Sequence, residues 1–212
     1  MKIIKLDFPE NQYVKQESNK NQIVLHHTVS GGKAAAVAHY WEGVEHRIAT
    51  SYIIERDGTI NELFDPKYWG GHLGMKVKHF MLFNLGYKNL NRTSIGIELI
   101  SWGGIKKINN KFYACYGNEV KDNILELPKY RGYTYFHKYT NEQIESLKNL
   151  LIDLGNRFKI PLDFHENIFE TNSSAISGKS GIWSHTSYRP DKSDIFPQKE
   201  MIEMLKNLTK IK

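Results

Sequence analysis

Cysteine is nearly absent from this chain, since Cys115 is the only one among 212 residues. A single thiol cannot form an internal disulfide, which excludes a small domain stabilised by disulfide bonds. Cys115 lies in the strand-like aromatic run 110–116. We expect a buried, unreactive thiol there rather than a nucleophile.

Long apolar runs are also missing. No segment approaches the roughly 20 apolar residues that a membrane-spanning helix needs, so we expect no stable membrane insertion. Residues 1–10 carry charges where a signal peptide requires its apolar stretch. The sequence therefore predicts a protein made in the cytoplasm without a signal peptide. If it acts outside the cytoplasm, another factor must release it.

Acidic residues are fewer than basic ones. The 29 Lys and Arg against 23 Asp and Glu give a formal net charge of +6. A basic surface attracts polyanions, which include nucleic acid, anionic cell-wall polymers and lipopolysaccharide. The basic residues are scattered and form no dense stripe interleaved with aromatic residues. This distribution favours a solvated lysine-rich surface, and we expect no nucleic-acid partner.

The hydrophobic pattern predicts strands mixed with a few long helices. The predicted elements are a strand at 23–25, a helix at 33–45, a hairpin at 51–60, a strand at 94–100, and helices at 140–158 and 198–208. The length and the content of 40% hydrophobic residues are those of one globular domain. We therefore expect a single α/β domain over 1–212, with a central mixed β-sheet flanked by helices.

Two of the predicted helices have more detailed signals. Thr140 and Gln143 form a capping-box pattern at the start of the helix over 140–158. The helix over 33–45 carries Val37, Tyr40 and Trp41 near helical spacing, which predicts a single apolar face.

Three segments have no clear helical period. Residues 1–22 are expected to form an N-terminal arm. The aromatic and lysine-rich segment 103–138 is expected to be an insertion, either a hairpin or a long loop. Residues 167–182 are rich in Ser, Gly and Asn, which predicts a loop.

A possible metal site comes from two distant segments. The run Ile-Val-Leu before His26 and His27 delivers a histidine pair to the end of a predicted strand, and a second segment holds His185, Lys192 and Asp194. A catalytic zinc site uses three protein ligands and one water. Neighbours on a strand point to opposite faces, so at most one histidine of the pair should face the metal.

A structural role for these histidines is the competing interpretation. A single histidine is more often a packed structural residue than a ligand. The helical His-Glu-x-x-His zinc motif is absent, because Asn, Ile and Phe follow His165 and Glu166. Residue types alone leave both interpretations open.

Five motifs occur in the order found in a known protein family. They are the run 23–28, the hairpin 51–60, the segment Trp69-Gly-Gly-His-Leu-Gly74, the strand 94–99 and the segment from His185 to Asp194. Together they resemble the zinc-dependent N-acetylmuramoyl-L-alanine amidases of the type-2 amidase and peptidoglycan-recognition-protein superfamily. The resemblance spans most of residues 21–208 and implies the fold of that superfamily.

The resemblance also implies roles for individual residues. It implies His26, His185 and Asp194 as ligands of one Zn²⁺ per chain, Glu98 as the general base and Lys192 as the cation that stabilises the oxyanion. The substrate-binding residues that it implies are His72, Trp69 and Thr50. Many relatives have a cysteine in place of Asp194, and the short phage lysozymes have a tyrosine in place of Thr50. Segments 103–138 and 167–182 are longer than the compact family pattern.

The function that follows is hydrolysis of the amide between N-acetylmuramic acid and L-alanine in bacterial peptidoglycan. We expect a monomeric phage endolysin that reaches the cell wall after holin-type release. One alternative is a cytoplasmic amidase that recycles soluble muropeptides. Another is a non-catalytic peptidoglycan-binding module, which the retained ligand set argues against. A basic nucleic-acid-binding domain is favoured by net charge alone.

Overall fold

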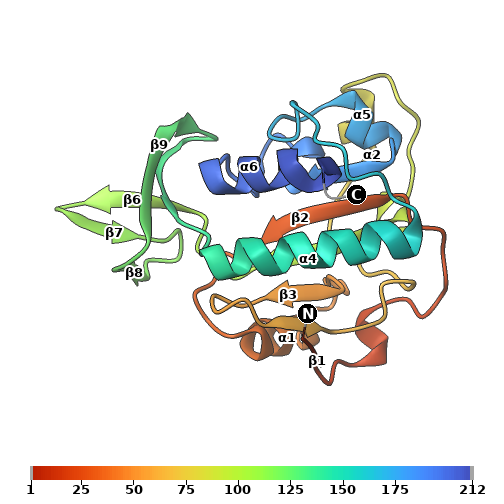
Figure 1. Cartoon of the computed structure of the whole chain (residues 1–212), viewed down its shortest axis with the longest axis horizontal. Helices are drawn as coiled ribbons and strands as arrows, with labels where there is room; N and C mark the ends of the chain where they lie inside the picture. Colours follow the sequence, from red (N-terminus) through yellow and green to blue (C-terminus); the bar gives the residue numbers. More distant parts are fainter. Residues whose placement is uncertain (1, 211–212) are drawn as a thin grey trace.

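A mixed six-stranded sheet forms the centre of the protein in a computed structural model that describes residues 2–210 (Figure 1). The strand order is β1-β4-β3-β5-β2-β11. The strands are β1 (Ile3–Lys5), β2 (Gln22–His27), β3 (Tyr52–Ile54), β4 (Ile60–Glu62), β5 (Ser94–Leu99) and β11 (Gly181–Ser184). The predicted α/β fold with a central mixed sheet is confirmed.

The middle of the sheet is parallel and covered on both faces. Every residue of β2 and β5 is buried, as expected for apolar strands between two layers. Strand β2 pairs in parallel with β5 on one side and with β11 on the other. The carboxyl ends of these three strands therefore meet at one edge of the sheet, which is where ligands bind in open α/β sheets.

Helices cover both faces of this sheet. They are α1 (Ala34–Glu42), α2 (Val77–Met81), α3 (Leu90–Thr93), α4 (Asn141–Phe158), α5 (Ser173–Ser177) and α6 (Lys199–Asn207), with short 3₁₀ turns η1 (Glu10–Gln12), η2 (His185–Ser187) and η3 (Leu208–Lys210). Figure 1 shows the long α4 lying over the sheet, roughly along the direction of β2 and β3. Among the described residues, no helix combines the length and the apolar character that crossing a membrane requires.

The largest apolar core lies between the sheet and helices α4 and α6. Leu147 and Leu151 of α4 pack there with Ile23 and Ile97 of the sheet. The predicted capping box begins α4, because Thr140 Oγ1 accepts from Gln143 N and Gln143 Oε1 accepts from Thr140 N, both at 3.1 Å. The sequence therefore predicted both the start and the buried face of this helix.

Helix α1 packs on the opposite face of the sheet. Val37 and Trp41 are buried there with Ile53 of β3. Tyr40, which the spacing placed on the same apolar face, is 71% exposed. The prediction for Tyr40 was wrong, because its neighbour Trp41 occupies the buried side of this short helix.

The predicted hairpin is formed by β3 and β4, which pair antiparallel with Ile54 opposite Ile60. Gly58 in its turn has φ of +83°, a conformation that favours glycine. The hairpin also lies beside β5 through the parallel β3–β5 pairing.

Segment 103–138 forms a second sheet instead of a single hairpin or a loop. Its antiparallel order is β8-β7-β6-β10-β9, with β6 (Gly104–Ile108), β7 (Lys111–Tyr113), β8 (Glu119–Val120), β9 (Ile124–Tyr130) and β10 (Tyr133–His137). Figure 1 shows it beyond the edge of the central sheet toward which β2 points. Phe136 is fully buried toward the main core, while Ile105 and Val120 form a small separate core.

Three further sequence predictions need correction. Cys115 is exposed, because it lies in the turn between β7 and β8. Segment 167–182 is not all loop, since it contains helix α5 and the start of β11. The arm 1–22 is partly in the sheet, because β1 pairs in parallel with β4 and Gln22 begins β2.

Gln143 joins α4 to the sheet. Its Nε2 donates to the carbonyls of Ile54 at 3.1 Å and Ile100 at 3.0 Å. Replacing it in Gln143→Leu leaves buried polar groups without a partner, so we expect a loss of about 1–3 kcal/mol in the free energy of unfolding. Urea denaturation measures this. The control Asn149→Ala, an exposed amide on the same helix, should stay within about 0.5 kcal/mol of wild type; equal losses would contradict the assignment.

Candidate functional site

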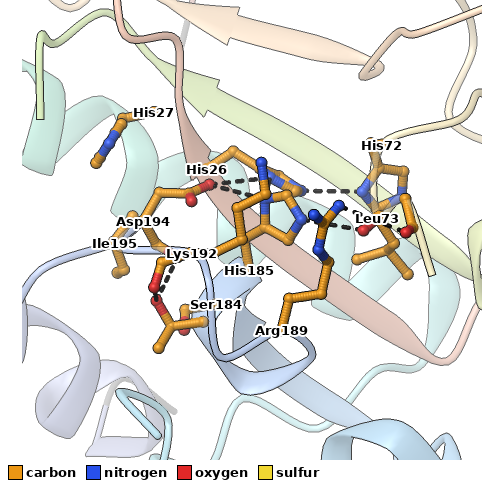
Figure 2. A network of polar contacts seen from close by, with 12 residues as sticks. His26, His27, His72, Leu73, Ser184, His185, Arg189, Lys192, Asp194 and Ile195 are labelled. Atoms are coloured by element: carbon orange, nitrogen blue, oxygen red, sulfur yellow. Dashed lines mark hydrogen bonds and ion pairs between the residues drawn. The ribbon is translucent and has the colours of Figure 1, made fainter. Parts of the chain in front are cut away.

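Three candidate ligand side chains converge at the carboxyl edge of the central sheet (Figure 2). His26 Nδ1 lies 3.0 Å from His185 Nδ1 and 3.2 Å from Asp194 Oδ2. His185 Nδ1 lies 3.0 Å from the same carboxylate oxygen. All three residues are buried. The structure thus brings together two segments that are 159 residues apart in the sequence.

The strands explain why these residues meet. His26 is the fifth residue of β2, and β11 pairs with β2 so that Ser184 lies opposite Leu25. His185 follows Ser184 directly as the first residue of η2, so it lies beside His26. The loop after η2 then returns, with the amide of Thr186 donating to the carbonyl of Asp194 at 2.8 Å.

A chain of hydrogen bonds fixes the proton on His26. Ser94 Oγ donates to the carbonyl of Leu90 at 2.7 Å, so it accepts from His72 Nε2 at 2.9 Å. The neutral His72 ring then has a free lone pair on Nδ1, which accepts from His26 Nε2 at 2.9 Å. A neutral His26 therefore carries no proton on Nδ1.

A hydrogen bond also selects the tautomer of His185. Its Nε2 donates to the carbonyl of Leu73 at 3.1 Å, so a neutral His185 carries no proton on Nδ1. When both rings are neutral, two ring nitrogens and a carboxylate oxygen face one another with lone pairs only. Such a set repels itself unless a cation lies among the three atoms. Ligand atoms at a tetrahedral Zn²⁺ stand about 3.3 Å apart for bonds of about 2.0 Å, close to the separations found here.

The charge states agree with this geometry. Burial, followed by the charge of His185, lowers the pKa of His26 to about 4. Burial alone would raise the pKa of Asp194, but when His185 is protonated in the absence of metal, its charge and hydrogen bond outweigh this effect and hold that pKa well below its usual value. Near neutral pH the site therefore offers a neutral imidazole and an ionised carboxylate, the forms that bind metal.

Glu98 lies beside this cluster with no hydrogen-bond partner on one oxygen. It is opposite His26 in the β2–β5 register and 9% exposed. Within the described residues its Oε2 is buried and unpaired. Burial first, and then the negative charge of Asp194, raise the pKa of Glu98 well above its usual value, while Lys192 opposes the shift. A carboxyl group in this state is suited to proton transfer near neutral pH.

A cleft of about 690 Å³ opens over the three ligands. Glu98, His72 and Lys192 line it. Its lining also includes residues that the sequence did not predict for the site, namely Trp41, His46, Lys76, Asn91 and Arg189. No sequence signal places these side chains at the cleft, so only the fold reveals them.

The second histidine of the pair is buried on the other face of β2, with His27 Nδ1 2.9 Å from the hydroxyl of Tyr139. Two predicted substrate-binding residues lie away from the cleft. Trp69 does not line the cleft, because its backbone pairs with Val14 of the N-terminal arm. Thr50 does not line the cleft either, because it is 1% exposed and packs against Gly96 under His72. Their predicted contact with substrate therefore has no support in the geometry.

The sequence pattern of the N-acetylmuramoyl-L-alanine amidase family matches residues 16–197. The chain belongs to this amidase family. Its fold is similar to that of the N-acetylmuramoyl-L-alanine amidase LysC from Clostridium intestinale URNW, with a TM-score of 0.52 at 18% identity over 100% of this chain and 99% of that one. No curated protein sequence matches significantly.

Two other solved structures share the fold of this amidase. One is a mutant endolysin from Bacillus subtilis, with a TM-score of 0.54 at 16% identity over 97% of this chain and 96% of the other. The second is a selenomethionine derivative of AmpD, with a TM-score of 0.52 at 18% identity over 96% and 93%. At these identities the likeness shows the fold alone.

The hydrogen bond from His26 to His72 can be tested in the amidase. His72→Phe keeps an aromatic ring but removes the acceptor that orients His26, so we expect the zinc dissociation constant to rise about 10–100-fold. Competition with a chelator measures it, and circular dichroism checks folding. His39→Gln, an exposed histidine of α1, is the control. Wild-type zinc affinity in folded His72→Phe would refute the orienting role.

Proposed function

We propose that this amidase is a zinc enzyme that hydrolyses the amide between N-acetylmuramic acid and L-alanine in peptidoglycan. The observation that carries the proposal is the convergence of three possible ligand atoms, His26 Nδ1, His185 Nδ1 and Asp194 Oδ2. Family membership supports the amide and the peptidoglycan substrate.

The donor set suits zinc. Two imidazole nitrogens and one carboxylate oxygen form a three-ligand set typical of catalytic zinc sites, and the cleft leaves room for a fourth ligand. When bound, Zn²⁺ supplies polarisation of the scissile carbonyl and lowers the pKa of a water to about 7.

Glu98 is proposed as the general base. Its unpaired oxygen lies on the same face of the sheet as His26, where it can take the proton of the attacking water. The same carboxyl group can then deliver that proton to the nitrogen of the leaving L-alanine amine. Positioned acid–base groups of this kind contribute about 10²–10⁴-fold to rate.

Lys192 is proposed to stabilise the oxyanion. It lines the cleft two residues before Asp194, so the turn that supplies a ligand also fixes this ammonium near the reacting carbonyl. A fixed charge that faces the developing negative oxygen costs no reorganisation during the reaction.

A phage endolysin is the proposed context. A fold shared with an endolysin and a basic net charge of +6, suited to an anionic cell wall, support it. A cytoplasmic enzyme that recycles soluble muropeptides is the second candidate, because the fold is equally similar to that of AmpD. Turnover of intact sacculi distinguishes the two.

Zinc dependence can be tested by mass spectrometry of the products from purified peptidoglycan. We expect free stem peptides that begin at L-alanine with zinc present, none after chelation, and their return when zinc is restored. The products locate the cleaved bond, while the chelation cycle tests the metal.

Parallel digests of soluble muropeptides serve as the comparison. Cleavage of muropeptides without cleavage of sacculi would favour the recycling enzyme over the endolysin. A protein that binds no zinc, or that cleaves as well after chelation, would refute the metal assignment.

Glu98→Gln tests the base. Because the amide cannot accept the proton, we expect kcat to fall about 10²–10⁴-fold with zinc still bound stoichiometrically. Glu203→Gln, an exposed carboxyl on α6, should keep full activity. Near wild-type turnover by zinc-loaded Glu98→Gln would show that another group takes the proton.

A further inference from the structure

The second sheet contacts the metal-binding loop through its β9–β10 turn. Tyr130, the last residue of β9, places its hydroxyl 3.1 Å from the carbonyl oxygen of Phe169, 3.2 Å from Thr186 Oγ1 and 3.3 Å from the carbonyl oxygen of Ile195. Thr186 follows the ligand His185, and Ile195 follows the ligand Asp194. One hydroxyl therefore touches the chain next to two ligands.

The loop between these ligands closes on itself at the same point. The backbone amide of Thr186 donates to the carbonyl of Asp194 at 2.8 Å, and Thr186 Oγ1 donates to the same carbonyl at 3.0 Å. The Tyr130 hydroxyl completes this junction from outside the loop. A shift of Thr186 relative to Asp194 would disturb both ligands together.

The neighbouring residue Arg131 holds the outer part of the loop. Its Nη1 donates to the carbonyl of Pro190 at 3.0 Å. Pro190 lies two residues before Lys192, so this bond restrains the turn that carries the ammonium. Tyr130 thus contacts the loop beside its two ends, and Arg131 contacts it near its middle.

Packing fixes the ring of Tyr130. It lies 6.5 Å from the ring of Phe169, edge to face, and 6.2 Å from that of the buried Phe136. Burial raises the pKa of Tyr130, so the hydroxyl keeps its proton and remains a donor near neutral pH. The ring position is set by the second sheet and the core, not by the loop.

We propose that the second sheet restrains the loop bearing Lys192 and Asp194, and that Tyr130 is its positioning residue. This inference rests on the proposed zinc hydrolase and gives segment 103–138 a role in that site. Groups that orient metal ligands from outside the coordination shell affect metal affinity and activity about 10–100-fold when removed.

Tyr130→Phe tests the inference because it keeps the ring and removes only the hydroxyl. We expect the amide of Thr186 to exchange about tenfold faster in native-state hydrogen exchange of the metal-free protein. We also expect the zinc dissociation constant, from chelator competition, to rise about tenfold.

Tyr52→Phe is the matched control. Its hydroxyl donates to Glu62 at 3.0 Å on the face of the sheet covered by α4. Tyr52→Phe should lower the melting temperature but leave both Thr186 exchange and zinc affinity within about twofold of wild type. General destabilisation would therefore not explain faster exchange and weaker zinc binding in Tyr130→Phe.

Two outcomes would overturn the inference. One is Thr186 exchange in Tyr130→Phe within about twofold of wild type. The other is faster exchange with unchanged zinc affinity, which would show that the ligands do not depend on the restraint. If the wild-type protein binds no zinc, the proposed metal function fails, while the exchange of Thr186 still decides whether Tyr130 restrains the loop.

Discussion

The parallel register of β2 between β5 and β11 is the constraint on which the site depends. It places His26 opposite Glu98 and brings His185 next to His26. Because side chains alternate along a strand, a slip by one residue would turn His26 toward α4 and present His27 to the cleft. The buried apolar residues of β2 pack on both faces and prevent this slip. The hydrophobic core therefore determines the chemistry at the sheet edge.

Two buried carboxyl groups in this cleft have opposite properties. Asp194 contacts two histidines, and its pKa is held well below the usual value. Glu98 has an unpaired oxygen, and burial raises its pKa well above the usual value. When their environments give two neighbouring carboxyl groups different pKa values, one commonly transfers protons while the other stays ionised. The difference follows from hydrogen-bond partners rather than exposure, since both side chains are buried.

Much of the fold could be predicted from the sequence because its signals are local. The run before His26, the Asp-Gly turn and the capping box at Thr140 each determine structure within a few residues. The second sheet could not be predicted, because it buries side chains such as Ile105 and Phe136 on opposite faces. Candidate ligands were proposed from residue types in two distant segments, and a family resemblance then assigned their roles. The proton on His26 depends on Ser94, 68 positions away, which no local pattern reveals.

The position of β11 has a consequence for the order in which the molecule is assembled. It is the last strand of the central sheet in sequence order, and it pairs with β2 although the two strands lie far apart in the sequence. Contacts between such distant segments form slowly, because a long loop must close first. During synthesis His26 leaves the ribosome well before His185 and Asp194 do. The three candidate ligands can come together only after Asp194 has been synthesised, so their convergence is a late marker of correct folding.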